Sequence, residues 1–153
     1  MQILQAYSRH ISLIVPLFDQ YRQFYGKSPD SSGARLFLAD RLERRDSVIY
    51  MATDGEGSSE VGVAFAQLYP SFSSVETRRI WILNDLYVIP AWRRQGVAKG
   101  LMDRARHLAL ETKASRIILA TEADNRIAQA FYDRLGFRKD ERFVHYELTV
   151  TPD

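Results

Sequence analysis

The chain of 153 residues is long enough for one domain with a hydrophobic core, and 46% hydrophobic with 26% charged residues is typical of a globular protein. A net charge of +2 without a basic stripe gives no reason to expect nucleic acid as a partner. The absence of cysteine excludes disulfides and thiolate nucleophiles, and the three scattered histidines offer no spacing for a metal site. No apolar run approaches the ~20 residues of a membrane span and no secretory signal opens the chain, so we expect a cytoplasmic protein without a membrane partner.

The first half of the chain has the hydrophobic pattern of one strand, two helices and a hairpin. Apolar residues recur at helical spacing from about Ser8 until Gly26 ends the helix, and Pro29 with Asp30 provides a natural start for the next one. The Gly- and Ser-rich stretch TDGEGSSE separates the two strands of the hairpin. The expected elements are a strand at 1–7, helices at 8–25 and 28–45, and strands at 47–52 and 61–69.

The second half alternates strands with helices. Pro90 ends a long strand because proline cannot donate to a ladder, and Gly136 ends the last helix. The stretch RIILATE is continuously apolar, which is the pattern of a strand buried on both faces. The expected elements are a strand at 78–89, a helix at 97–112, a strand at 116–122, a helix at 124–137 and a strand at 143–150.

The resulting order, β-α-α-β-β-β-α-β-α-β, contains no repeat and no linker. It predicts an α/β fold of one domain, residues 1–153, in which about four helices flank a mixed central sheet. The strands on either side of the helix at 97–112 are joined by a crossover, so we expect them to be parallel neighbours.

The turn RRQGVAKG, residues 93–100, joins a strand to the helix at 97–112. The first turn of a helix carries about four unpaired N–H groups and about half a positive charge, so a phosphate can bind there if small residues let it approach. Gly96 and Ala98 are small, and two arginines and a lysine add charge. The pattern fits a pyrophosphate site, with a plain helix-entry loop as the alternative, and it matches neither a Walker loop nor a dinucleotide fingerprint.

Two stretches, LNDLYVIPAWRRQGVAKGLMDRA and NRIAQAFYDRLGF, resemble the acetyl-CoA core of the GNAT superfamily of N-acetyltransferases. The family signature Q/R-x-x-G-x-G/A corresponds to Arg93, Gly96 and Ala98. The residues that match a second signature, in the right order and spacing, are Asn125, Phe131, Tyr132, Gly136 and Phe137. The resemblance implies acetyl-CoA as co-substrate, no metal, and direct transfer of an acetyl group to a primary amine without a covalent enzyme intermediate.

The resemblance also implies which residues hold the cofactor. In such enzymes the strand before the turn splays from its neighbour, so its free backbone groups bind the thioester and the pantetheine arm. The implied cofactor-binding residues are Leu86, Tyr87, Val88, Arg93, Arg94, Gln95, Gly96, Val97, Ala98, Lys99, Asn125 and Tyr132. A spacing of seven residues places Asn125 and Tyr132 on nearly the same helix face. The alternatives are a helix cap for Asn125 and a core tyrosine for Tyr132.

Direct transfer poses two proton problems. An ammonium with a pKa of about 10.4 must lose a proton before attack, and a leaving thiolate, whose conjugate acid has a pKa of about 8.5 by analogy with cysteine, benefits from a donor. The resemblance assigns the donation to Tyr132, and the backbone N–H of Leu86 could stabilise the oxyanion. Asp85 is the nearest carboxylate, although strand alternation places it opposite Asn84 and Leu86. We therefore hypothesise a water relay that ends at Asp85, Glu122 or another acid.

The stretches WILNDLYV and AFAQLYPSFSSV resemble the spermidine/spermine and thialysine acetyltransferases, which carry Glu where this chain has Asn84. The acceptor stays open among small-molecule amines, such as polyamines, amino acids and aminoglycosides, and exposed lysines of proteins. The other possibilities are a non-catalytic acyl-CoA-binding or sensing domain on the same fold and a nucleotide-binding regulatory module. A homodimer is a family-level expectation.

Overall fold

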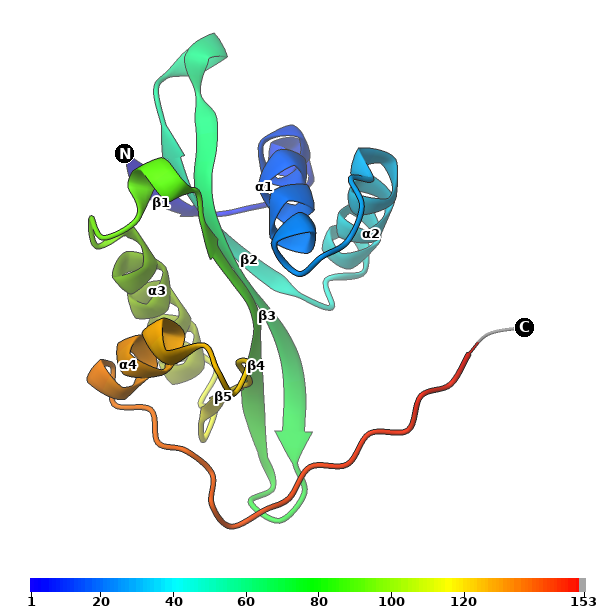
Figure 1. Cartoon of the computed structure of the whole chain (residues 1–153), viewed down its shortest axis with the longest axis vertical. Helices are drawn as coiled ribbons and strands as arrows, with labels where there is room; N and C mark the ends of the chain where they lie inside the picture. The colour runs from blue at the N-terminus through cyan, green and yellow to red at the C-terminus, as the bar shows by residue number, and fades with distance from the viewer. Residues whose placement is uncertain (152–153) are drawn as a thin grey trace. The chain divides into compact units, whose positions relative to one another are not determined.

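The computed structural model describes residues 1–151 (Figure 1). Its helices and strands are β1 (Gln2–Gln5), α1 (Ile11–Phe24), α2 (Ser31–Arg44), β2 (Val48–Asp54), β3 (Val61–Ser73), β4 (Arg78–Val88), α3 (Val97–Glu111), β5 (Ile117–Leu119) and α4 (Arg126–Arg134). Short 3₁₀ turns are η1 (Ser8–His10), η2 (Gly57–Ser59) and η3 (Pro90–Trp92). This order confirms the predicted α/β fold with a mixed sheet and four helices, apart from the last predicted strand.

The strands form one sheet in the order β1-β2-β3-β4-β5. Neighbours are antiparallel from β1 to β4, whereas β4 and β5 are parallel, with Trp81 opposite Ile117 and Leu83 opposite Leu119. Helix α3 lies between β4 and β5 in the chain and makes the crossover. The structure therefore confirms both the mixed sheet and the predicted parallel neighbours.

The chain divides into two compact units, residues 1–119 and the residues from Ala120 onward. In the first unit, α1 and α2 cover one face of the sheet and α3 covers the other (Figure 1). Among the helices that the structure describes, none combines the length and the hydrophobicity that a bilayer crossing requires.

Apolar side chains hold the sheet of the first unit between its two helical layers. Ile14 of α1, Leu38 of α2 and Phe65 of β3 are fully buried in one cluster. Leu101 and Ala105 of α3 are fully buried as well. Full burial of a side chain as large as Leu or Phe contributes about 1.5–3 kcal/mol, so this packing fixes the end of β4 from which the site is built.

The second unit contains α4 and an extended C-terminal segment. The side chain of Asn125 accepts a hydrogen bond from the N–H of Ala128 at 3.1 Å and so begins the helix. At the other end Gly136 has a φ of +91°, and the N–H of Phe137 donates to the carbonyl of Tyr132 at 3.0 Å. The helix therefore ends at the glycine that the sequence indicated.

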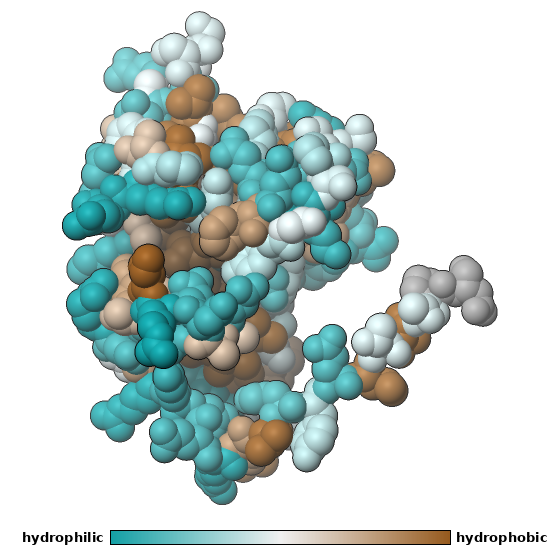
Figure 2. Space-filling view, viewed as in Figure 1, coloured by the Kyte–Doolittle hydropathy of each residue, from teal (hydrophilic) through white to brown (hydrophobic). Residues whose placement is uncertain are grey.

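The predicted strand at 143–150 is wrong, because this segment has no strand in the structure. Its apolar residues alternate with polar ones, yet Val144 is 78%, Tyr146 94% and Leu148 86% exposed. Figure 2 shows such apolar side chains along the extended segment. Alternation favours a strand only where a ladder partner and an apolar surface are available, and within residues 1–151 the segment pairs with no strand.

Strand β5 is shorter than the predicted strand at 116–122, and its side chains are not buried on both faces as predicted. Ile118 is 39% exposed. The physical reason is position, since β5 is the last strand of the sheet and has β4 as its one neighbour among the described strands.

Candidate active site

The turn between β4 and α3 presents backbone N–H groups at the start of a helix. Gly96 is the N-cap of α3 with a φ of +80°, and Arg94 has a φ of +60°. No side chain of the described residues caps α3, and the N–H of Gly100 donates to the carbonyl of Gly96 at 3.0 Å. A Cβ at Gly96 would meet no atom within 4 Å, so the space there is open. The N–H groups of residues 97–99 thus have the arrangement that binds anions.

Two side chains of this turn brace the turn itself. Arg93 Nε donates to the carbonyl of Val88 at 2.9 Å, and its guanidinium lies 5.8 Å from the ring centroid of Tyr87. Gln95 Nε2 donates to the carbonyl of Ala91 at 2.8 Å. These contacts stabilise the loop, so the backbone provides the cradle and these two side chains hold its shape.

The last residues of β4 have a strand neighbour on one side only. The parallel ladder with β5 ends at Leu83, whereas the antiparallel ladder with β3 continues to Val88. Leu86 lies opposite Ala66 of β3. On the β5 side, residues 84–88 therefore have no ladder partner among the described strands. Such a free edge is what the expected splay of β4 from its neighbour requires.

Asp85 of β4 is buried, with 4% of its surface exposed. Its Oδ2 accepts a hydrogen bond from Gln67 Nε2 at 2.6 Å, and its Oδ1 accepts one from Asn84 Nδ2 at 3.1 Å. Burial raises the pKa of the Asp85 carboxyl above its ordinary value, and hydrogen bonds from Gln67, Tyr21 and Asn84 oppose this rise only in part. Burial and the charge of Asp85 raise the pKa of Tyr69 to about 12, which keeps that phenol neutral. A carboxylate of raised pKa is a better proton acceptor than an ordinary aspartate.

A β-bulge in β4 brings the side chains of Asn84 and Asp85 together. Gln67 pairs with Asp85 and Leu68 pairs with Leu83, so Asn84 has no partner in this ladder. The extra residue interrupts the alternation, and both side chains line the same pocket within hydrogen-bond distance of each other. The prediction that Asp85 faces away from Asn84 is therefore wrong, because it assumes an uninterrupted strand.

A pocket of about 530 Å³ lies where α1 and α2 meet β4. Asn84 and Asp85 line it from β4, and four aromatic residues line it from the helices, namely Phe18, Tyr21, Tyr25 and Phe37. The hydroxyl of Tyr21 donates to the carbonyl of Asn84 at 3.3 Å. Because Asn84, Asp85 and Leu86 are consecutive, this pocket lies directly beside the part of β4 predicted to hold the reacting acetyl group.

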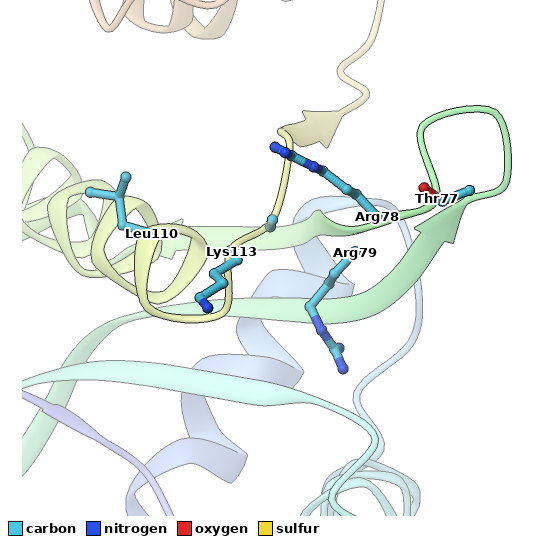
Figure 3. Close-up of a pocket in the computed structure, with 6 residues that line it drawn as sticks. Thr77, Arg78, Arg79, Leu110 and Lys113 are labelled. Carbon is cyan, nitrogen blue, oxygen red and sulfur yellow. The ribbon is translucent and has the colours of Figure 1, made fainter.

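A second hollow, of about 550 Å³, lies at the opposite end of β4. Arg78 and Arg79 from the start of β4 line it, together with Leu110 in the last turn of α3 and Lys113 just after that helix (Figure 3). Its lining within the described chain contains three cations and no carboxylate. Such a lining repels an ammonium, so this hollow is unsuited to an amine substrate.

Asn125 and Tyr132 belong to the second unit. The side-chain oxygen of Asn125 caps α4, as the helix-cap alternative predicts, and this bond leaves its amide nitrogen as a donor. The Tyr132 ring contacts the rings of Phe131 and Phe137, with centroids 5.4 and 5.6 Å apart. The roles of Asn125 and Tyr132 toward a cofactor stay predictions.

Sequence reasoning misses the aromatic wall of the pocket. Phe18, Tyr21 and Tyr25 follow a helical spacing, which indicates a core-facing stripe, yet Tyr25 is 45% exposed. The available signal is the residue type, because tyrosines at the end of such a stripe have a polar group that a dry core seldom accommodates. The pattern also gives no indication that a different helix, α2, completes the wall with Phe37.

Comparisons with known proteins agree with this architecture. The model of the acetyltransferase (GNAT) family matches residues 14–137. The uncharacterized N-acetyltransferase YhfO of Bacillus subtilis is 44% identical over 150 residues, 98% of each chain. The crystal structure of a "probable acetyltransferase" superposes with a TM-score of 0.91 at 44% identity and covers 100% of both chains. An aminoglycoside N(6′)-acetyltransferase type 1 of Acinetobacter genomosp. 13 is 25% identical over 123 residues, which is 80% of this chain and 84% of that protein.

The fold and the family match, which spans most of the chain, define the class of this protein as an acetyltransferase. The chain belongs to the acetyltransferase (GNAT) family, and it is an N-acetyltransferase enzyme. This assignment sets aside the two non-enzymatic alternatives. Within residues 1–151, no group of three or more His, Asp or Glu side chains is arranged to hold a metal ion.

Proposed function

We propose that this enzyme moves an acetyl group from acetyl-CoA directly to a primary amine of a small molecule or to an exposed lysine, with Asp85 as the proton acceptor. The observation that carries the proposal is the buried Asp85 carboxyl, which lines the aromatic pocket and immediately precedes Leu86. An alkyl ammonium has a pKa of about 10.4, so it needs a base before it can attack a carbonyl carbon. The raised pKa of Asp85 supports that role.

The start of α3 fits the pyrophosphate of coenzyme A. The helix has no side-chain cap, Gly96 leaves open space in front of it, and Arg94 is an exposed cation in the same turn. We propose that the free edge of residues 86–88 holds the thioester and the pantetheine arm, and that Asn125 bonds the arm through its amide. When bound, acetyl-CoA supplies an acetyl group activated as a thioester.

Three further groups of the chain have proposed roles in the transfer. The backbone N–H of Leu86 donates to the carbonyl oxygen as negative charge develops on it. The hydroxyl of Tyr132 donates a proton toward the departing sulfur. Asp85 takes the proton of the amine, directly or through water. No side chain bonds covalently to the acetyl group, in keeping with a chain that has no cysteine.

Finer parts of the assignment are also proposals. Residues 1–153 would form one N-acetyltransferase domain that acts in the cytoplasm. The domain would be a homodimer, and light scattering on the full chain tests this oligomeric state. The likeness of β3 and β4 to the spermidine/spermine and thialysine acetyltransferases is incomplete at Asn84, which cannot accept a proton near neutral pH. We propose that Asp85, brought beside Asn84 by the bulge, replaces the missing carboxylate.

Calorimetry on two matched variants of α3 tests the cofactor site. Ala98→Glu places a carboxylate in the first turn, where it suits the helix dipole but repels a diphosphate, so we expect acetyl-CoA to bind at least about 10-fold more weakly. Leu110→Glu changes a side chain that is 70% exposed in the last turn, and it should bind acetyl-CoA as the wild type does. Undiminished binding by Ala98→Glu, or tighter binding of ATP or NAD than of acetyl-CoA by the wild type, would contradict the proposal.

A further inference from the structure

The pocket beside Asp85 also carries information about the acceptor, and this inference rests on the proposed function. Two pairs of aromatic rings form its helical wall. Phe18 and Phe37 stack with centroids 5.6 Å apart and planes at 7°, and Tyr21 meets Tyr25 edge to face at 5.1 Å. Phe37 is 41% and Tyr25 45% exposed, so a bound ligand would cover apolar surface that water now contacts.

Most charges of the pocket are already satisfied by the protein. Arg22 Nη1 pairs with the buried Asp19 at 2.8 Å and donates to the carbonyl of Ser28 at 3.2 Å. Asp30 Oδ1 accepts the N–H of Gly33 at 2.8 Å and caps α2. These two side chains therefore hold the loop between α1 and α2 in place, and the charge of Asp30 lies at the N-terminus of α2, where the helix dipole favours it.

Two further charged groups line the pocket. Asp85 lies at the β4 wall, buried and hydrogen-bonded to amides, where it can receive one ammonium proton. Lys27 lies in the loop after α1 and is exposed, and its ammonium makes no hydrogen bond or ion pair with the residues that the structure describes. A ligand with a second ammonium would bring it toward Lys27, where like charges repel, and the exposed carboxylate of the lining, Asp30, already caps α2.

We propose that the pocket selects a primary amine that carries a single positive charge on an apolar aryl or alkyl group. The ammonium meets Asp85, and the apolar group packs on the rings of Tyr25 and Phe37, where the aromatic faces also favour the cation. The volume of about 530 Å³ accommodates one ring with a short chain. Polyamines and aminoglycosides, which carry several ammonium groups, are poor substrates in this account.

A panel of amines, assayed by release of the coenzyme A thiol with the full-length enzyme, tests the proposal. The probes are phenethylamine, hexylamine, spermidine and kanamycin. We expect kcat/KM for the two monoamines to exceed that for spermidine and kanamycin at least 10-fold. Faster turnover of spermidine or kanamycin overturns the proposal and leaves the proposed function standing. Acetyl-CoA binding without turnover of either monoamine also overturns the proposed amine selectivity. Failure to bind acetyl-CoA contradicts the proposed function itself.

Charge reversal at Lys27 gives a sharper test. Lys27→Glu replaces the repelling cation with a carboxylate, so the ratio of kcat/KM for spermidine to kcat/KM for phenethylamine should rise at least fivefold. Lys113→Glu reverses an exposed lysine in the basic hollow and is the matched control, with no gain expected. Equal gains in the two variants would mean a general charge effect and would overturn the role of Lys27.

The aromatic wall is tested by truncation. Phe37→Ala and Tyr25→Ala should each raise KM for phenethylamine at least fivefold with kcat nearly unchanged, because the rings bind the apolar group and not the reacting atoms. Phe72→Ala removes an aromatic side chain that is 69% exposed and does not line the pocket, so it should change neither constant. Unchanged KM values in both pocket variants contradict the proposal.

Discussion

The two ends of β4 carry hollows of nearly equal volume, about 530 and 550 Å³, with opposite chemistry. At the end that leads into α3, the lining combines Asp85 with aromatic rings. At the other end, where α3 finishes, three cations line an exposed depression. Size therefore does not identify the acceptor site, and the difference lies in which hollow offers a proton acceptor and an apolar wall.

The largest expected effect is on catalysis at the Asp85 end. Asp85→Asn keeps the shape of the side chain but removes the base, so kcat/KM should fall by roughly 100- to 1000-fold. Arg78→Gln, at the cationic end, should change kcat/KM less than twofold. Steady-state kinetics with saturating acetyl-CoA measure both, and a variant at Asp85 as active as the Arg78 variant would erase the functional difference between the two ends.

A smaller loss is expected when the proton donor is removed. Tyr132→Phe keeps the ring contacts with Phe131 and Phe137 but lacks the hydroxyl, so kcat should fall about 10-fold while the Kd for acetyl-CoA stays the same. Kinetics together with calorimetry separate these quantities. Undiminished kcat would assign Tyr132 to packing alone and leave Asp85 as the only side chain with a proton-transfer role in the account.

The turn at the start of α3 should respond to backbone strain. Gly96 has a φ of +80°, which costs an L-residue with a Cβ about 1–2 kcal/mol, so Gly96→Ala should lower the free energy of unfolding by about that amount. Gly96→Asn is the control, because asparagine adopts this conformation more readily and should cost less. Urea denaturation compares them, and equal stabilities of all three proteins would contradict the strained geometry of the turn.

The smallest effect concerns the dependence of stability on pH. Because the folded-state pKa of Asp85 is raised, the stability linked to this group is fully present below its ordinary pKa of about 3.8 and is lost as the pH rises through the folded value. Asp85→Asn removes the titrating carboxyl and so abolishes this pH-dependent loss of stability. The new amide can also donate to Gln67 Oε1, which is buried and has no partner among the described residues. The Tm of the variant relative to wild type should therefore be higher at pH 8 than at pH 4. A difference in Tm between variant and wild type that does not change with pH would contradict a raised pKa of Asp85.

Periodicity and local chemistry predict the frame of this molecule. The stripe of 97–112 gives α3, the crossover gives the parallel pair β4 and β5, and Asn125 and Gly136 mark both ends of α4. Each of these depends on residues close in sequence. The resemblance to the family likewise depends on two contiguous motifs, so it is readable without the fold.

The parts that the sequence does not reveal depend on distant residues. The bulge at Asn84 follows from the register between β3 and β4, so strict alternation misplaces Asp85. The pocket needs Tyr25, Lys27 and Phe37 from separate segments, and Tyr25 looks like part of a core stripe. The segment at 143–150 has the composition of a strand, but pairing decides whether one forms.

Titration of the ¹⁵N-labelled enzyme with coenzyme A, followed by amide chemical shifts, tests the proposed cofactor site at the start of α3, because the two ends of β4 offer rival sites for an anion. We expect the largest shifts at residues 96–99, with further shifts at 86–88. Small changes are expected at Arg78, Arg79 and Lys113. Dominant shifts at those three residues, with the signals of residues 96–99 unchanged, would contradict the proposed cofactor site.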